Sequence, residues 1–524
     1  MFPTPTTVDA ILRSSLSDLW AFLPELAVGG TIVALLVLRL FDSLGRLHLG
    51  WVALLGLSGA LALACGQWLG LPELDPRRAD VRPVVRLDLF SGLLSFDQFA
   101  LALRVVVLTA GVLSLAVCLF SGIPDDQDAA DFGTLLAGGT LGMMLMVTAQ
   151  HLLMIIIALE MASLPGYALA GFLKGKRQGS EAALKYVVYG AAAAGVTLYG
   201  ISLLAGRFGS GHLPDIAPQL AAAADEPIVL LGLIFVLCGL GFKLAAVPFH
   251  FWCPDVFEGA AAEVAGFLSV ASKAAALGLT TRLFFSLGDL PAALIGLLAA
   301  LAALTASFGN LAAFGQTNLK RLLAYSTIAH AGYMLMAVCT LRAAGSAALL
   351  FYLTIYTIMN LGAFACVAYL RNRTGTEDLS GLRGCVEHSP LVVVALAVCL
   401  FSLLGLPPLA GFAAKFQLFR VLFEAGQSPT GPLPGWVYFT LLGVGVVNTA
   451  LSAVYYLRVL RVMVLEPADT AGAPRPLRPT RAGAALVGTL ALLLVMLGIA
   501  WGPLSHAAGL SVLIPATRSV GVSG

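Results

Sequence analysis

Apolar residues follow one another along this chain in long stretches, and polar residues are confined to short interruptions. Stretches such as residues 227–240, PIVLLGLIFVLCGL, recur along nearly the whole length. A helix of about 20 such residues spans a hydrocarbon core of about 30 Å. A transmembrane β-barrel is excluded, because its strands alternate in segments of about ten residues. The runs, read against Gly, Pro and charged residues, predict about fourteen helices, near residues 18–41, 50–71, 97–121, 131–149, 152–173, 181–206, 228–250, 262–286, 290–309, 321–340, 345–370, 390–424, 435–462 and 482–503.

Composition supports the same class. Of the 524 residues, 59% are hydrophobic and only 11% are charged, whereas globular domains carry about 25% charged residues. We therefore predict an all-α polytopic membrane protein. The first twenty residues, MFPTPTTVDAILRSSLSDLW, lack the basic segment, apolar core and cleavage site of a removable signal. The first membrane helix is expected to serve as the insertion signal.

Lys and Arg residues in the short loops predict the orientation, because they concentrate on the cytoplasmic side. With the N-terminus outside, cytoplasmic loops and helix ends hold about twice as many of these residues as the outer side, among them Lys176, Arg371 and Arg458. Both termini are therefore predicted on the outer, periplasmic side.

Cofactor motifs are missing from the sequence. The eight cysteines show no C-x-x-C and no paired spacing suited to zinc or iron–sulfur ligation, and neither G-x-G-x-x-G nor G-x-x-x-x-G-K-[ST] occurs. We therefore expect no cofactor-binding and no metal-binding residues on this chain. The cysteines are interpreted as small packing residues.

Two of the predicted helices are interrupted by proline in mid-membrane, one at AAVPFH (245–250) and one at GLPPLAGF (405–412). Proline removes a backbone hydrogen bond, and a freed carbonyl at membrane depth is tolerated only against protein or a water-filled cavity. The broken helices lie five helices apart and each bears a lysine, which predicts two five-helix repeats, the second inverted because five is odd. The predicted division is residues 1–125 for helices one to three, 126–289 and 290–466 for the repeats, and 467–524 for a loop and the last helix.

Four ionisable residues lie well inside apolar helices: Glu160, Lys243, Lys273 and Lys415. A charge at a helix centre costs about 2.5 to 3.5 kcal/mol, so four cost on the order of 10 kcal/mol unless neutralised or hydrated. One interpretation is structural: each lysine extends to an interface, or Glu160 pairs with one of them. The other is a proton path. Burial disfavours a charged amine and a carboxylate within about 4–6 Å favours it, so a lysine subject to both can exchange a proton near neutral pH.

Three further residues are candidates for the same path, each with a structural alternative. His250 follows Pro248 and could relay protons or bind a carbonyl freed by the break. His330 lies in the middle of a predicted helix and could connect the two lysine groups or pack in the core. Lys185 follows Glu181 by four residues, which is the spacing of a surface ion pair.

Other charges are expected at the membrane boundary. Asp255, Glu258 and Glu263 fall in a predicted loop after the first break, where they could be solvated charges or a proton-collecting funnel. Lys320 and Arg321 are expected to mark a cytoplasmic boundary.

Several stretches together resemble a known family. They are GFKLAAVPFHFWCPDVFEGA, LKRLLAYSTIAHAGY, SEAALKYVVYGAAAAGVTLYGISLLAG, ALEMASLPGYALAGF and GLPPLAGFAAKFQLF. Across residues 130 to 425 the chain resembles the antiporter-like membrane subunits of respiratory complex I, the proton-translocating NADH–quinone oxidoreductase. PDVFEGA favours the subunit N branch, as does the lack of a long C-terminal helical extension. Cys253 stands where a small polar residue is expected.

The resemblance implies fourteen helices with inverted five-helix repeats. It matches Glu160 to the family's helix-5 glutamate, Lys243 to the helix-7 lysine, Lys273 to the helix-8 lysine and Lys415 to the helix-12 lysine, with Lys185 at a helix-6 lysine. Glu160 would bias Lys243, Lys273 would carry the proton along the midplane, and Lys415 would exchange it with the far half-channel.

The resemblance also implies the surroundings of the chain. FMN, iron–sulfur clusters and quinone would be bound by other subunits, and this chain would be a translocase subunit without a redox site. Its partners would be other membrane subunits, including the sister antiporter-like subunits, in the inner membrane of a bacterium, together with lipid, protons and water; no nucleic-acid partner is expected. Two alternatives remain: a Na⁺/H⁺ or K⁺/H⁺ antiporter subunit, which would be expected to have extra carboxylates in the broken helices, and a structural subunit without a working channel.

Overall fold

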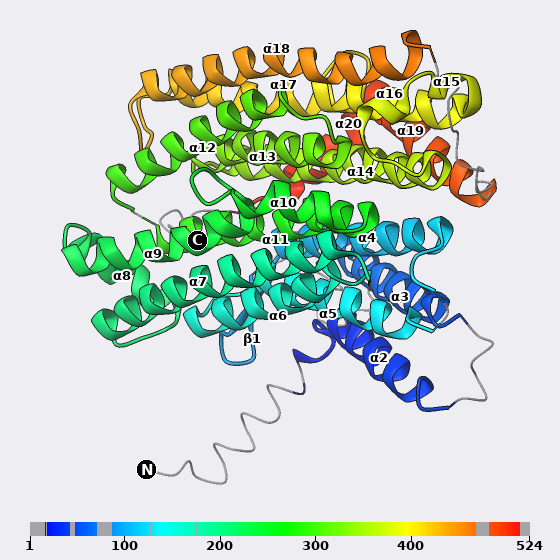
Figure 1. The fold of residues 1–524 in the computed structure, drawn as a ribbon. Coiled ribbons are helices and arrows are strands. Elements are labelled where there is room, and N and C mark those ends of the chain that lie inside the picture. Colours follow the sequence, from blue (N-terminus) through cyan, green and yellow to red (C-terminus); the bar gives the residue numbers. More distant parts are fainter. Residues whose placement is uncertain are drawn as a thin grey trace.

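A computed structural model describes residues 16, 18–41, 48–70, 86–125, 127–173, 175–288, 290–467 and 481–513. The described chain is helical apart from one short hairpin of β1 (Leu87–Leu89) and β2 (Leu94–Phe96). Figure 1 shows the helices in successive rows, from α2 at the bottom to α18 at the top, with α10, α11 and α14 between them. Both chain ends lie outside the described residues, as do residues 468–480.

The first part of the chain, up to residue 288, contains α2 (Leu23–Leu38), α3 (Gly50–Leu69), α4 (Gln98–Ser121), α5 (Ala129–Thr148), α6 (Leu152–Ala170), α7 (Arg177–Phe208), α8 (Leu213–Ala223), α9 (Pro227–Leu244), α10 (Trp252–Gly259) and α11 (Ala262–Leu287). The second part contains α12 (Ala292–Ala313), α13 (Leu319–Val338), α14 (Ala343–Thr374), the 3-10 helix η4 (Leu379–Leu382), α15 (Cys385–His388), α16 (Pro390–Leu404), α17 (Ala410–Gln427), α18 (Gly435–Leu465), α19 (Arg481–Ile499) and α20 (Gly502–Leu510). Each predicted apolar segment contains one of these helices, and segment 390–424 is divided between α16 and α17.

Within the described residues, eleven helices are long and apolar enough to cross a membrane. Helices α2 and α16 are apolar but shorter. Helix α13 has the length but contains Arg321 and His330, and α17 contains Lys415, Arg420 and Glu424. The chain is therefore a multi-pass membrane protein in which two of the long helices are unusually polar.

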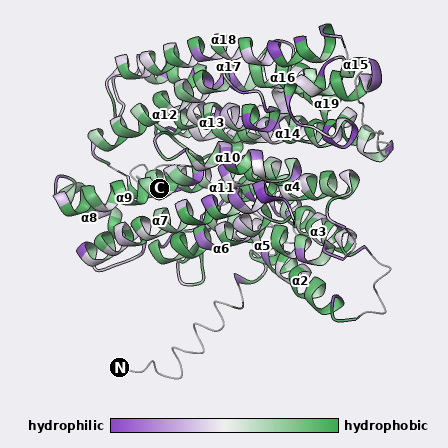
Figure 2. Cartoon of the chain, in the orientation of Figure 1, coloured by the Kyte–Doolittle hydropathy of each residue, from purple (hydrophilic) through white to green (hydrophobic). Residues whose placement is uncertain are grey.

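Helices α11 and α14 form the centre of the fold. Nearly every residue of both is buried, whereas most residues of α7, α18 and α19 face outwards. Helix α11 packs against α14, α4, α5, α13 and α9. Figure 2 shows hydrophobic residues along most helices and hydrophilic ones at the ends and in the interior near α10, α11 and α14. Lipid and neighbouring proteins would cover the apolar outer surface, which accounts for it. The polar residues in the interior have no such explanation and need one.

Both predicted helix breaks are present. Helix α9 ends where Ala245 adopts a left-handed conformation with φ of 54°, and α10 begins at Trp252. Helix α16 ends at Gly405, whose φ is 89°, and α17 begins at Ala410. A Cβ on Gly405 would lie 3.0 Å from Cδ of Lys415, so the absence of a side chain suits both the turn and the lysine beside it.

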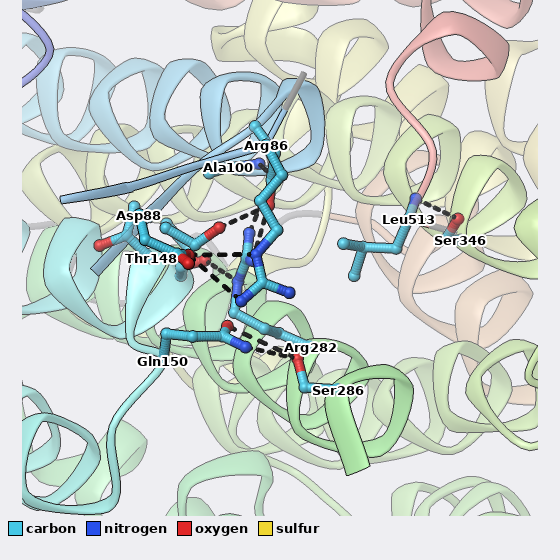
Figure 3. Close-up of polar contacts among 12 residues, drawn as sticks. Arg86, Asp88, Ala100, Thr148, Gln150, Arg282, Ser286, Ser346 and Leu513 are labelled. Atoms are coloured by element: carbon cyan, nitrogen blue, oxygen red, sulfur yellow. Dashed lines mark hydrogen bonds and ion pairs between the residues drawn. The ribbon is translucent and has the colours of Figure 1, made fainter. Parts of the chain in front are cut away.

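A buried ion pair joins the start of α4 to α11. Asp97 caps α4 by accepting a hydrogen bond from the amide of Ala100, and its two oxygens lie 2.7 and 2.9 Å from the Arg282 guanidinium. Nε of Arg282 donates to the carbonyl of Val147 at 2.8 Å. In Figure 3, Arg282 lies among dashed polar contacts near Thr148, with Gln150 bonded to Ser286 beside it. The pair holds α4, α5 and α11 together at this end of the bundle.

Replacing Arg282 with leucine is expected to destabilise the protein by about 3–5 kcal/mol, because the Asp97 carboxylate would remain buried without its partner. Burial raises the pKa of Asp97, but Arg282 and the hydrogen bonds from Ala100 and Ser95 outweigh burial and hold it below its usual value. The pair's contribution is therefore complete above the unfolded-state pKa of about 3.9 and is lost as pH falls through the folded-state value.

The measurement is thermal unfolding of the purified assembly that contains the chain. The loss caused by Arg282→Leu should be largest at high pH and should shrink as pH falls, because the buried Asp97 without its partner takes up a proton more readily. The double variant Asp97→Leu/Arg282→Leu should be more stable than Arg282→Leu alone. Equal stability of the single and double variants would contradict the assignment.

Candidate functional site

Three of the four candidate lysines are buried. Lys243 is 3% exposed, Lys273 is 0% exposed and Lys415 is 4% exposed, while Glu160 is half-buried. Side chains this far buried are covered by protein, which disfavours the interpretation in which each lysine extends along the outer surface to an interface. Each lysine lies next to a helix break or on the central helix: Lys243 in the last turn of α9, Lys273 in the middle of α11, and Lys415 in the second turn of α17.

Glu160 and Lys243 face a common cavity. Glu160 projects from α6 and Lys243 from α9, and both line a space of about 10 Å³ together with Ser163, Tyr167 and Thr197. That volume is at the lower limit for one water molecule. The two groups lie within electrostatic range of each other, but no direct ion pair joins them in the described part of the chain. A charge change on Glu160 would therefore be felt at Lys243 without a contact that locks the two together.

Lys273 is held by aromatic faces. Its Nζ lies 5.5 Å from the ring centroids of both Trp252 and Phe257. No described residue accepts a hydrogen bond from this Nζ. The Trp252 ring also stacks on that of Tyr186, with 4.4 Å between the centroids, and its indole nitrogen donates to the carbonyl of Phe242 near the end of α9. The surroundings of Lys273 are thus coupled to the helix break that follows Lys243.

Lys415 forms its hydrogen bond at the second helix break. Its Nζ donates to the carbonyl of Leu404 at 3.0 Å, and Leu404 is the last residue of α16 before the break. The break frees this carbonyl from helix hydrogen bonding, which makes it available to the amine. The same Nζ lies 4.9 Å from the ring centroid of Tyr333 on α13.

The two candidate histidines are in different surroundings. His330 lies on α13 with Nδ1 at 2.8 Å from the Tyr352 hydroxyl, and it lies within electrostatic range of Lys415. His250 lies in the break after α9, 3% exposed, with its ring 4.5 Å from those of Phe251 and Phe308. Nδ1 of His250 has no hydrogen-bond partner among the described residues. The geometry therefore places His330 with Lys415 and leaves His250 apart, against aromatic rings.

Besides Lys273, polar groups that were not candidates in the sequence lie on the two central helices. Four buried atoms on α11 and α14 find no partner in the described structure: Ser272 Oγ, Lys273 Nζ, Tyr356 OH and Asn360 Oδ1. The Asn360 amide donates to Ser269 at 2.6 Å, and the Tyr356 ring lies 5.3 Å from that of His330. Unpartnered buried polar groups of this kind call for ordered water. The signal in the sequence was the polar Tyr and Asn residues within the apolar run of α14, FYLTIYTIMNLGAF.

Lys185 belongs to a separate cluster at the surface. Its Nζ lies 2.8 Å from carboxylate oxygens of both Glu181 and Asp255, and Arg321 bridges Asp255 and Glu258 at 2.7 and 2.6 Å. These five residues line an open cavity of about 270 Å³. Burial raises the pKa of Asp255, but Lys185 and Arg321 outweigh it and hold the value below the usual range. The predicted Glu181 pair is confirmed.

One boundary prediction is wrong. Asp255 and Glu258 lie in α10 rather than in a loop, and Glu263 is buried in the first turn of α11, where Arg371 binds it at 3.0 Å. Lys320 is also buried; it donates to the carbonyl of Ala260 and pairs with Glu377, each at 2.7 Å. These charges fasten helix ends to one another, because the chain turns there against protein and not into solvent.

Across the described ranges, no three or more His, Cys, Asp or Glu side chains are grouped so that they could hold a metal ion. The cysteines are free thiols, six of them buried and Cys65 and Cys238 partly buried.

Comparison with known proteins identifies the family. Residues 149–430 match the family model described as NADH:quinone oxidoreductase/Mrp antiporter, TM. NADH-quinone oxidoreductase subunit N of Anaeromyxobacter sp. (strain Fw109-5) is 39% identical over 523 residues, covering 95% of this chain and 96% of that protein. A chain of respiratory complex I from Thermus thermophilus with bound Aureothin is 33% identical with a TM-score of 0.74, covering 93% of this chain and 99% of that one.

A chain of the Mrp complex from Dietzia sp. DQ12-45-1b has a TM-score of 0.79 at 22% identity, covering 94% of this chain and 97% of that one, which shows a shared fold alone. The fold is thus common to antiporter-like subunits, and the sequence identity distinguishes among them. The chain belongs to the subunit N family of NADH–quinone oxidoreductase.

Proposed function

We propose that this chain moves protons across the membrane through a relay of Glu160, Lys243, Lys273 and Lys415. As a proton-translocating membrane subunit of NADH–quinone oxidoreductase, it couples quinone reduction elsewhere in the complex to proton movement. The observation that carries the relay is the burial of three lysines, each beside a helix break or on the central helix. A charged amine in a membrane is costly unless it is neutralised, paired or hydrated, and ionisable groups kept at such positions mark proton pathways.

The relay proceeds from one half of the fold to the other. A charge or conformational signal reaches Glu160, and movement of this carboxylate changes how strongly Lys243 holds its proton. Lys243 lies within electrostatic range of Lys273, so the two ammonium charges disfavour each other. The proton passes along the midplane from Lys273 towards His330 and Lys415, and Lys415 exchanges it with the far half-channel.

Water completes the central part of this path. Ser272, Tyr356 and Asn360 present buried polar atoms that have no partner among the described residues; Ser272 precedes Lys273 in α11, and the Tyr356 ring lies 5.3 Å from that of His330. Amine and imidazole groups that are not in contact exchange protons through one or more bridging waters. His330 is assigned to the relay, because it lies within electrostatic range of Lys415 and its ring lies 5.3 Å from that of Tyr356. His250 and Lys185 are assigned lesser roles, His250 at the break and Lys185 in the open cavity where protons would be collected.

The membrane topology proposed here has fourteen crossings, with α5–α11 and α12–α18 as inverted repeats and both termini on the outer side of a bacterial inner membrane. The similar position of the two breaks supports the repeats. Residues 86–96, 149–152 and 207–227 then share the outer side, which agrees with the hydrogen bonds of the hairpin and the α8 segment to residues 149–152. Arg39, Lys185 and Arg371 then share the cytoplasmic half.

The partners proposed are the other membrane subunits of the complex, including the sister antiporter-like subunits, and lipid. NADH, FMN, iron–sulfur clusters and quinone are assigned to other subunits. A cation antiporter is the second candidate, favoured only by the fold shared with the Mrp complex chain. A purely structural subunit is the third, and it leaves the buried lysines unexplained.

The test is the variant Glu160→Gln, which keeps the size of the side chain and removes its charge. NADH-driven proton uptake by inside-out membrane vesicles is expected to fall about tenfold, since Lys243 loses an interaction equivalent to about one pKa unit. Glu226→Gln is the matched control, because Glu226 is an exposed carboxylate paired with Arg207. Uptake should stay unchanged when choline replaces Na⁺ and K⁺; dependence on either cation would favour the antiporter.

A further inference from the structure

Lys415 differs from Lys243 in having no carboxylate beside it. Within the described ranges its Nζ forms no ion pair and has two neighbours of note, the Leu404 carbonyl at 3.0 Å and the Tyr333 ring at 4.9 Å. One neutral carbonyl is a weak replacement for the hydration shell of an ammonium ion. The face of an aromatic ring attracts a cation and does so more strongly away from water. The Tyr333 ring is therefore the second group that can stabilise the charged form of Lys415.

The Tyr333 ring is held in place by its own hydroxyl. The Asn310 amide of α12 donates to that hydroxyl at 3.0 Å, and the Asn310 carbonyl oxygen accepts from Tyr455 of α18 at 2.9 Å. Asn448 of α18 approaches Asn310 at 3.3 Å and donates to Ser307 at 3.0 Å. All but Ser307 are buried. Three helices thus fix the ring whose face is turned to the amine.

We propose that Tyr333 is a positioning residue for Lys415: its ring face stabilises the ammonium form during proton transfer, and the Asn310–Tyr455–Asn448 network keeps the ring beneath the amine. This inference rests on the proposed function and adds a residue to it. Lys273 offers a parallel, because it lies over Trp252 and Phe257 and also forms no ion pair in the described structure. Aromatic faces take the place of carboxylates at both lysines that follow Lys243 along the relay.

The experiment compares Tyr333→Phe with Tyr333→Leu in the assembled complex, and measures NADH-driven proton uptake by inside-out vesicles as a function of pH. Phenylalanine keeps the ring face and removes only the hydroxyl that holds the ring in place, so the rate of proton uptake should stay within about threefold of the original. Leucine removes the face. The rate should then fall about tenfold. In the leucine variant, the uptake rate should begin to decline at a lower pH than in the original protein, because less of Lys415 is in the ammonium form.

Two further variants keep the result decisive. Lys415→Met in the same assay tests the proposed function itself. Normal pumping by that variant would overturn the relay. If Lys415→Met does not pump, the relay stands and the tyrosine variants decide the role of Tyr333. Should Tyr333→Leu fail to assemble, pentafluorophenylalanine at 333 keeps the ring's shape and removes the negative potential of its face. Equal rates and equal pH profiles for the phenylalanine and the leucine or fluorinated variants would overturn the inference.

Discussion

Methionine in place of Lys243 is expected to stop proton pumping through this subunit while the complex still assembles. Methionine has a similar length and fills the same space, and an apolar side chain in this surrounding removes the cost of burying an amine. A positioned group that transfers protons contributes about 100-fold or more to the rate of its step. NADH-driven proton uptake by inside-out vesicles should therefore fall about 100-fold, or to the background of the assay.

The matched control is Lys176→Met, because Lys176 is an exposed lysine just before α7. Its uptake should equal that of the original protein. The amount of assembled complex, measured on a native gel, separates the two main interpretations. Normal pumping by Lys243→Met would contradict the relay, and normal pumping per complex with poor assembly would identify the subunit as a scaffold.

The second large effect is expected at Lys273, where two variants separate the ability to release a proton from the positive charge itself. Lys273→Met removes the proton carrier and should again lower uptake about 100-fold. Lys273→Arg keeps a cation over Trp252 and Phe257, but a guanidinium does not release its proton in proteins. The arginine variant should therefore also fail to pump, even if it assembles better than the methionine variant.

Uptake, NADH oxidation and assembled complex are measured together for both Lys273 variants. A failed methionine variant beside an active arginine variant would show that Lys273 acts only as a fixed charge. Activity in both would remove Lys273 from the path. Failure of both, with normal assembly, is the outcome that the proposal requires.

Much of the architecture follows from the sequence, because helices in a membrane have to be apolar, long and internally hydrogen-bonded. Both breaks were predicted from proline and glycine, and they lie at Ala245 and Gly405. The buried lysines were found because a charge within an apolar run is rare enough to stand out. The number of crossings and the inverted repeats stay predictions, as do the roles of the individual residues.

The remaining features depend on contacts between residues far apart in the chain. Arg282 meets Asp97, and Arg104 meets Glu25 at 2.7 Å with both side chains fully buried, yet no spacing rule connects either pair. Glu263 was expected in a loop, whereas it is buried in the first turn of α11, and the contacts that bury Lys320 come from residues distant in the chain. The aromatic faces at Lys273 and Lys415 were equally hidden, since Trp, Phe and Tyr are ordinary residues in any apolar helix.

The ion pairs at the two ends of α11 bear on how the relay can move. Glu263 is tied to Arg371 of α14 near one end, and Arg282 is tied to Asp97 at the other. Lys273 lies ten residues after Glu263 and nine before Arg282, which places it about 14 Å along the axis from either fastening. A helix that is fixed by an ion pair near each end cannot shift along its axis or tilt far. Proton transfer would therefore depend on rotation of side chains and rearrangement of water around an α11 that stays in place, and not on movement of the helix itself.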